Sequence, residues 1–495
     1  MSPADRDDRL VVAAAILQRR YLAAPMLCAA ALGAGMIATA QPRAALGLVT
    51  VAGLVLLMWC TPVAGLGLLL LLLCVVPYGL QNQLGIGGGE RSPGLLLSDL
   101  LLAAGLIWAL LRLASRRLDP RTVRYVALLT GFLLVCVLQF LHGVRAGHDV
   151  SRAGQDCRVL LGFGTFLIAL PLLHEPARRR RLLITLAALG LALGAWGMVQ
   201  WFGKVSFGAA GDVGVRPGVR LTSAGSGQLQ GGEYGFPVVV VVCFAVLMSG
   251  AVRHPGARAA LVLAIILNAA SCLVTFERTF WLDALLGCAF VLALAPRPQR
   301  VRALLAAPLV ILLALAALSV AAPQELRTAQ ERLLSLGQYS SDASVRYRVV
   351  ESSFVLDQIR AAPLLGSGLA ATIFWGQPWA QVPAKSYAFS HNGYLWLAWR
   401  LGVPAAAMLV LMLGSAALLR AGPGADPLSR GLQCGARGAL LGLLLASVTF
   451  PSFSALSITP AMGVLLALAV WRNPGKLYEQ AGRSGGAGHT FAQHS

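Results

Sequence analysis

The sequence predicts an all-α, polytopic membrane protein with about fourteen transmembrane helices (between twelve and fourteen) and with both termini in the cytoplasm. Of its 495 residues, 57% are hydrophobic and only 12% are charged, and the mean hydropathy is +0.72. A soluble domain of this length needs far more polar surface. The apolar residues also form blocks that approach the ~20 residues needed to cross a hydrocarbon core. Such blocks must be helical, because lipid cannot hydrogen-bond to open backbone groups.

The charges between the apolar blocks predict how the spans are oriented. Alternate loops are short and rich in arginine, which is typical of the cytoplasmic side. The count depends on whether Cys60-Thr61-Pro62 separates two helices or lies inside one broken helix. We expect spans at approximately 21–40, 44–60, 63–80, 95–114, 124–141, 159–174, 182–202, 237–252, 259–276, 279–296, 303–322, 392–414, 431–449 and 456–471.

These spans divide the chain into tails, helical blocks and two sizeable outer segments. Residues 345–360 have helical periodicity that ends at Ala361-Ala362-Pro363. A loop as long as the second outer segment is usually functional. The predicted segments are a cytoplasmic N-terminal tail (1–20), N-terminal transmembrane helices (21–202), an outer loop (203–236), transmembrane helices (237–322), a large outer loop with short helices (323–391), C-terminal transmembrane helices (392–472) and a flexible cytoplasmic tail (473–495).

Several functional classes are disfavoured by composition and motifs. The net charge of +20 comes from residues scattered in short loops, not from one basic face with interleaved aromatics, so nucleic-acid binding is not expected. The chain has no P-loop, which disfavours an ATP-driven pump. The outer segments contain no Asp-x-Asp motif, and we expect neither a metal ion nor another cofactor.

The outer segments hold more arginine than orientation requires. Such a face suits an anionic ligand at the membrane surface, such as a lipid-linked phosphate. For any single arginine the alternative is headgroup anchoring. Arg158, Arg216 and Arg220 are candidate substrate-binding residues on this basis.

Arg278 follows Glu277 at the outer turn between two strongly apolar blocks. A charge so close to hydrocarbon is costly unless it is paired or functional. Either Arg278 binds substrate with the help of Glu277, or the two form an interfacial pair that only marks the turn.

Arg346 and Arg348 lie on the helix predicted at 345–360, which Asp342 or Ser344 would cap. Residues two positions apart on a helix point to different faces. We therefore expect only one of the two arginines to enter a site.

His391 and Asn392 lie where the second outer segment returns to the membrane. Imidazole is the only side chain whose unperturbed pKa lies near neutrality, so it suits proton transfer from a sugar hydroxyl. A lone histidine is more often structural. Asn392 either orients His391 or caps the helix that follows.

Together these residues resemble a known family. Ser390-His391-Asn392-Gly393-Tyr394-Leu395, followed by Leu401-Gly402, resembles the His-Asn signature of the O-antigen ligase and O-antigen polymerase family. Arg348-Val349-Val350-Glu351 leading to Pro363-Leu364-Leu365-Gly366-Ser367-Gly368 resembles its preceding block, and Glu277-Arg278-Thr279 its earlier arginine. The similarity runs roughly from 240 to 450. Arg400 departs from the pattern, because many relatives carry an acidic or neutral residue there. Either it faces the cavity, or, as is more usual for such a charge, it snorkels or forms a helix-packing pair.

The resemblance implies a GT-C-type, metal-independent and inverting glycosyltransferase. The donor would be a glycan on undecaprenyl diphosphate, presented at the periplasmic face of the bacterial inner membrane. The acceptor would be a lipid-linked repeat unit for a polymerase, or lipid A–core for a ligase. By motif, Arg278 and Arg348 would hold the diphosphate, and His391 would serve the acceptor or the leaving phosphate. Membrane lipids, a chain-length regulator and a flippase would be partners.

The span count and the two outer segments favour a polymerase over a ligase. The alternative from a different class is a secondary transporter or a lipid-linked glycan flippase. Transporters usually have repeat-related broken helices and ionisable groups near the bilayer midplane. Here the charges gather at the outer ends of the predicted spans instead. A non-catalytic assembly scaffold would not require three motifs in order.

Overall fold

The computed structural model describes residues 42–76, 96–116, 118–203, 218–221, 227–230, 235–305, 322–334, 343–377, 382–420 and 426–472, with isolated positions between 306 and 321. The predicted span 21–40, both predicted tails and most of the predicted span 303–322 lie outside these residues.

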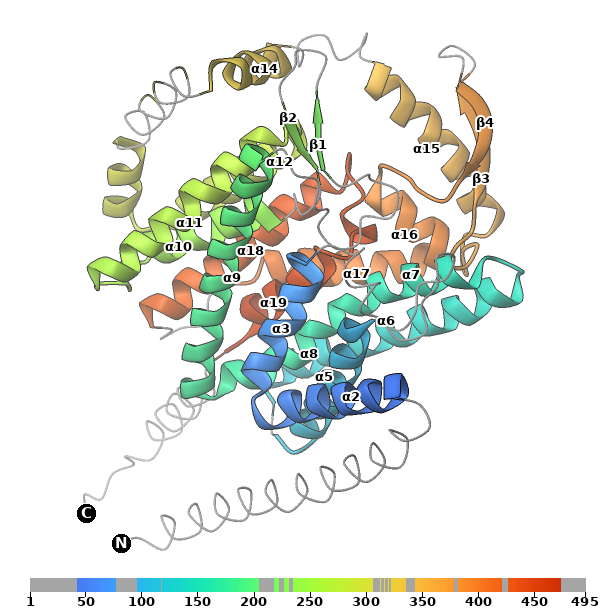
Figure 1. The fold of residues 1–495 in the computed structure, drawn as a ribbon, viewed down its shortest axis with the longest axis horizontal. Coiled ribbons are helices and arrows are strands. Elements are labelled where there is room, and N and C mark those ends of the chain that lie inside the picture. The colour runs from blue at the N-terminus through green and yellow to red at the C-terminus, as the bar shows by residue number, and fades with distance from the viewer. Residues whose placement is uncertain are drawn as a thin grey trace, which may run out of the picture.

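The described chain is helical apart from two small hairpins (Figure 1). The first half contains α2 (Pro42–Cys60), α3 (Pro62–Cys74), α5 (Leu97–Ala114), α6 (Pro120–Arg145), α7 (Val150–Leu161), η1 (Gly162–Gly164), α8 (Thr165–His174), α9 (Pro176–Gly203), β1 (Gly218–Leu221) and β2 (Gly227–Gln230). The second half contains α10 (Gly235–Met248), α11 (Pro255–Val274), α12 (Arg278–Leu294), α14 (Pro323–Leu334), α15 (Ala343–Ala361), β3 (Ile373–Gln377), β4 (Val382–Tyr387), α16 (Gly393–Leu401), α17 (Val403–Ala417), α18 (Pro427–Ala446), η4 (Ser452–Ser454) and α19 (Thr459–Val470).

Local sequence explains several helix starts. The Asp119 carboxylate accepts hydrogen bonds from the backbone N–H groups of Arg121 and Thr122, both at 3.1 Å, and Pro120 occupies the first position of α6. Asp149 caps α7 in the same way at 2.7 Å from the Arg152 nitrogen. Asp426 caps α18, at 3.0 Å from the Ser429 nitrogen. An Asp cap satisfies amides that have no partner within the helix.

Five described helices are long and apolar enough to cross a membrane: Leu97–Ala114, Pro120–Arg145, Val150–His174, Pro176–Phe202 and Pro255–Val274. The outward face of α6 shows why a lipid environment is needed. Leu134, Leu138 and Leu141 recur at helical spacing and are 60%, 54% and 55% exposed. Such a stripe is stable only against lipid or a partner. The protein is therefore an α-helical membrane protein, while the number of crossings stays a prediction.

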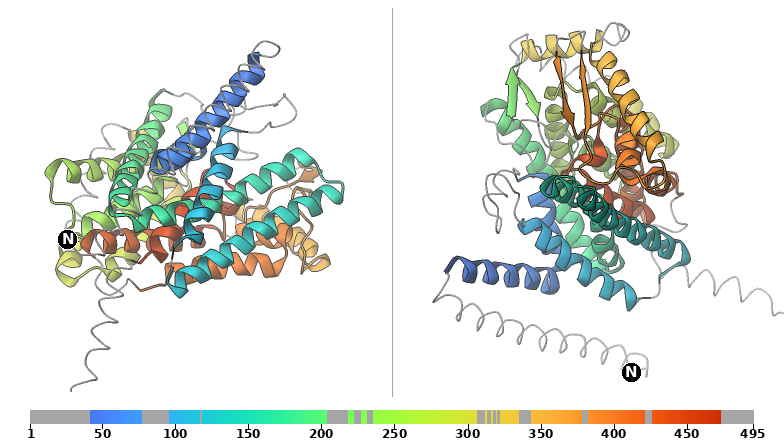
Figure 2. Two further views of the ribbon diagram at one scale, coloured as in Figure 1. Left: turned by 90° about the horizontal axis from the view of Figure 1, so that it is seen from below. Right: turned by 90° about the vertical axis from the view of Figure 1, so that its right-hand side faces the viewer.

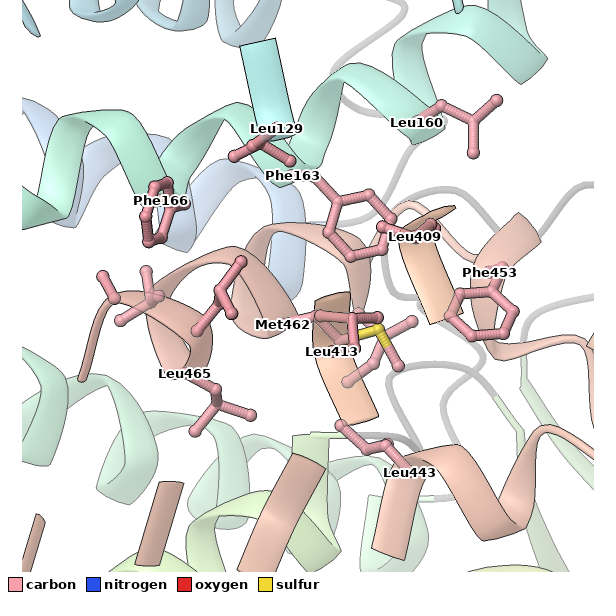
Figure 3. Close-up of a cluster of buried hydrophobic side chains, with 14 of the residues drawn as sticks. Leu129, Leu160, Phe163, Phe166, Leu409, Leu413, Leu443, Phe453, Met462 and Leu465 are labelled. Atoms are coloured by element: carbon pink, nitrogen blue, oxygen red, sulfur yellow. The ribbon is translucent and has the colours of Figure 1, made fainter. Parts of the chain in front are cut away.

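The helices converge on a core drawn from both halves of the chain (Figure 3). Phe163 and Phe166 from the α7–α8 region meet Met462 and Leu465 of α19, and all four are buried. Phe163 also packs edge-on against Phe132 of α6, with ring centroids 6.0 Å apart. The Thr165 hydroxyl donates to the Pro460 carbonyl at 2.7 Å, which ties the two halves together.

Two expectations need correction. The predicted span 392–414 is two helices, α16 and α17, which break at Gly402. The predicted span 159–174 begins earlier, because α7 starts at Val150 and places Arg152 and Arg158 on a helix. The described chain is predominantly helical, in agreement with the all-α prediction, and two small antiparallel hairpins, β1–β2 and β3–β4, lie within the predicted outer segments.

Other expectations are confirmed. Cys60 ends α2 and Pro62 begins α3, so two helices meet at Thr61. The helix predicted at 345–360 is α15, and it ends at Ala361. α14, α15 and both hairpins gather at one end of the molecule, with α2 at the opposite end (Figures 1 and 2). The described parts of the two predicted outer segments thus lie at one end, while the side of the membrane on which they lie stays a prediction.

Candidate active site

His391 is held by Glu351 of α15. The Nδ1 atom of His391 lies 3.0 Å from Oε2 and 3.2 Å from Oε1 of Glu351. The backbone N–H of His391 also donates to Glu351 Oε2 at 2.9 Å. With the carboxylate as the acceptor, Nδ1 carries the ring proton and Nε2 keeps a lone pair. The side chain of His391 is 28% exposed and that of Glu351 only 2%, so the pair lies at the edge of the buried region.

The pattern of α15 explains why Glu351 faces inward. Val355 and Ile359 follow Glu351 at intervals of four, and all three side chains are buried. This spacing gives one inward stripe on a helix. Burial of a carboxylate is costly unless hydrogen bonds compensate it, and the two N–H groups of His391 supply them.

Arg348 lies on the same side of α15 as Glu351, one turn earlier. It is half-buried, and its Nε has no hydrogen-bond partner among the residues that the structure describes. Arg346, in contrast, is exposed. The expectation that the two arginines point to different faces is therefore confirmed. A buried N–H without an acceptor is costly, and an anionic oxygen would satisfy it.

Aromatic rings bracket the imidazole. Tyr347 and Phe389 both meet His391 edge-on, with ring centroids 5.4 Å and 4.8 Å away. Burial, and then the nearby Glu351 charge and Tyr387, raise the pKa of Tyr347 above its ordinary value. Tyr347 therefore keeps its proton at neutral pH and adds no charge to the site.

Asn392 caps α16. Its Oδ1 accepts from the backbone N–H groups of Tyr394 at 3.0 Å and Leu395 at 3.1 Å. Of the two roles considered for Asn392, capping is the one that the geometry supports. The cap fixes the chain direction one residue after His391.

Arg278 begins α12 directly after a strained turn. Phe276, 2% exposed, has φ = 53°, in the left-handed region that non-glycine residues rarely adopt. The Thr275 hydroxyl accepts from the Glu277 N–H at 3.2 Å. Arg278 is half-buried. A guanidinium at a helix N-terminus makes the local potential favourable for an anion.

One segment, residues 447–453, joins the Arg278 turn to the His391 turn. The hydroxyls of Thr279 and Thr449 are 3.1 Å apart, and the rings of Phe280 and Phe450 are 4.9 Å apart. On the other side, the Gly393 N–H donates to the Ser447 carbonyl at 2.8 Å. The three motifs, far apart in sequence, thus converge around α15, α16 and this segment.

The remaining candidates are not brought to His391 by any contact that the structure describes. Arg158 makes a two-pronged ion pair with Asp99, at 2.7 Å from Nε and 2.8 Å from Nη2. That pair makes Arg158 a link between α5 and α7. Arg220 lies on β1 in register with Gln228, and Arg216 lies outside the described residues. Their assignment to substrate binding stays a prediction.

Sequence reasoning missed Glu351 as a site residue. It appeared only as the last residue of the Arg348 motif. The available signal was its spacing: Glu351 follows Arg348 by three positions on a helix, so the two share a face. Among the described residues, no group of three or more His, Cys, Asp and Glu side chains could hold a metal ion.

No curated protein matched the chain. Residues 261–410 match the family model described as O-antigen ligase. This stretch contains Arg278, Arg348, Glu351 and His391, which are the residues from which the site was built. The match over these residues supports an O-antigen ligase and polymerase-like family for the chain.

Proposed function

We propose that this protein is a glycosyltransferase that extends a surface polysaccharide as a polymerase at the periplasmic face of the bacterial inner membrane. The donor is a glycan on undecaprenyl diphosphate, and the acceptor is a second lipid-linked repeat unit. The observation that carries the proposal is the contact of His391 with Glu351, 3.0 Å from Nδ1 to Oε2, where Glu351 shares a face of α15 with Arg348.

The pair suits a general base. An acceptor hydroxyl gives its proton to Nε2 of His391 while its oxygen bonds to the anomeric carbon of the donor. The bond from that carbon to the diphosphate oxygen breaks, and undecaprenyl diphosphate leaves with the electron pair. Glu351 holds the ring and stabilises the imidazolium that forms. One displacement of this kind inverts the anomeric configuration.

Arg348 and Arg278 suit the leaving group. Departure of the diphosphate develops negative charge, and fixed guanidinium groups stabilise that charge where water is largely excluded. Arg348 already has a buried donor without an acceptor among the described residues. Two arginines can neutralise the diphosphate without a divalent cation.

A ligase is the second candidate, because the matching family model is described as O-antigen ligase. The chemistry at His391 is the same, and only the acceptor changes to a lipid A–core sugar. Deleting the gene separates the functions. Single repeat units on lipid A without long polymer indicate a polymerase. Polymer that never reaches lipid A indicates a ligase, and lipid-linked units left on the cytoplasmic face indicate a transporter.

Alanine variants test the site. We expect Arg278→Ala, Arg348→Ala and His391→Ala each to lower turnover of lipid-linked glycan by roughly 10²–10³-fold, by analogy with loss of an oxyanion-hole donor. Arg346→Ala is the matched control, since Arg346 is exposed on another face of α15; its rate should stay within about twofold of wild type. Wild-type glycan profiles in the three site variants, inserted at normal levels, would refute the assignment.

A further inference from the structure

Arg400 is the most completely buried charge near the site. Its exposure is 0%, and its guanidinium stacks on the Trp399 ring, 4.2 Å from the centroid. Nη1 donates to the Ala371 carbonyl, and Nη2 donates to the Ala388 carbonyl at 2.6 Å. Nε lies 3.6 Å from Oδ2 of Asp156. No step of the proposed reaction uses this residue.

The two carbonyls belong to the base of the β3–β4 hairpin. Ala371 comes two residues before β3, and Ala388 comes directly after β4. Asp156 completes the clamp from α7, because its Oδ2 accepts from the Ala370 N–H at 2.9 Å. One guanidinium and one carboxylate therefore fix both stems of the hairpin to the membrane helices.

The same clamp bears on His391. Arg400 lies in the last turn of α16, and its side chain reaches back toward the start of that helix, as helical side chains do. The bond to Ala388 fixes the chain three residues before His391, while Asn392 fixes it one residue after. The backbone is thus fixed on both sides of His391, and the hydrogen bonds to Glu351 fix the His391 side chain.

We propose that Arg400 is a positioning residue for His391, acting through the Ala388 carbonyl at the base of the hairpin. The inference rests on the proposed function, in which His391 accepts the proton. A side chain that merely filled space could be apolar, and buried charges often contribute little net stability. An apolar residue here would leave the two carbonyls without these donors and Asp156 without the nearby guanidinium charge. Their release would let the residues before His391 shift.

The test compares Arg400→Lys with wild type in purified protein, using a lipid-linked glycan as substrate. Lysine keeps the charge but cannot reproduce the planar two-pronged contact. We expect kcat to fall about 10–10²-fold, because a misplacement of about 1 Å has this effect. KM for the donor should stay within about twofold. If Arg400→Lys fails to fold, the double variant Arg400→Met with Asp156→Asn removes both charges together. It should show the same combination of a lower kcat and an unchanged KM.

A cycle with Glu351→Gln separates positioning from general damage. If both residues act by placing His391, their losses in kcat are less than additive. Arg437→Lys is the matched control. Arg437 is 6% exposed on α18 and donates to the carbonyls of Leu419 and Gln433, so its loss should lower thermal stability and leave kcat unchanged.

An unchanged kcat in a folded Arg400 variant, or losses that add fully with Glu351→Gln, overturns the inference. Failure of the proposed function gives a different result. In that case His391→Ala itself retains activity in the same assay. If His391→Ala loses activity while Arg400→Lys keeps the wild-type kcat, the proposed function still holds and only the role of Arg400 is refuted.

Discussion

At the residue scale, the site depends on a carboxylate whose described ion-pair contacts are with His391 alone. Glu351 accepts from both N–H groups of His391. Arg348 shares its helix face but forms no ion pair with it among the described residues. The electrostatic effect of Glu351 is therefore directed at the imidazole, and Arg348 stays available for an anion. A glycosyl transfer from a diphosphate needs a carboxylate that orients the base and separate cations that stabilise the leaving group.

Glu351→Gln tests the carboxylate without changing its size. A glutamine keeps an acceptor oxygen, but its neutral amide lacks the charge that stabilises the imidazolium, and its NH₂ group can face Nδ1 and favour the other tautomer. We expect kcat to fall by at least about 10²-fold, since an acid-to-amide change beside a catalytic histidine disturbs its tautomer. Asp357→Asn is the control on the same helix, because the Asp357 side chain is 66% exposed. Near-normal turnover in Glu351→Gln would show that His391 does not act as the base.

At the element scale, the break between α16 and α17 comes from a close approach of two turns. Gly402 has φ = 83°, and a Cβ there would lie 2.1 Å from the Leu364 carbonyl oxygen. The Val403 N–H donates to the Pro363 carbonyl at 2.8 Å, and the Ser367 N–H to the Trp399 carbonyl at 2.8 Å. The sequence predicted one span across this region because hydropathy averages over a window. The break depends on a segment about forty residues upstream, which no local pattern contains.

Gly402→Ala should therefore be strongly destabilising. The left-handed conformation alone costs a non-glycine residue about 1–3 kcal/mol, and the clash with Leu364 adds to that cost. Gly414→Ala on α17 is the matched control, since nothing lies within 4 Å of a Cβ there and alanine favours a helix by roughly 1 kcal/mol. Thermal unfolding in detergent should show a clear loss of Tm for Gly402→Ala only. Equal Tm values for Gly402→Ala and Gly414→Ala would mean that the close contact between Leu364 and Gly402 does not stabilise the interruption between α16 and α17.

At the scale of the whole molecule, the class of fold followed from composition, but the arrangement of the site did not. The ends of α15 and the Cys60–Pro62 boundary were predictable because proline and helical periodicity act locally. The contact of Glu351 with His391 joins residues forty positions apart, and the Thr279–Thr449 contact joins residues 170 apart. Periodicity says which face of a helix is buried, not what it meets. The order of the motifs suggests that they meet in space. Their actual contact depends on the packing of α12, α15 and α16 on the 447–453 segment.

The common end of the two outer segments leads to a test of sidedness. Arg346 on α15 is exposed at the end where α14 and the hairpins gather, and Arg258, also exposed, lies in a predicted cytoplasmic loop. In a background with Cys60 replaced by Ser, a membrane-impermeant thiol reagent should label Arg346→Cys in cells with a permeabilised outer membrane. Arg258→Cys should react only after the inner membrane is opened, because basic loops stay in the cytoplasm. Labelling of both positions from outside would make the number of crossings between them even instead of odd. Protection of Arg346→Cys until the inner membrane is opened would place α15, and His391 with it, on the cytoplasmic side, away from a periplasmic donor.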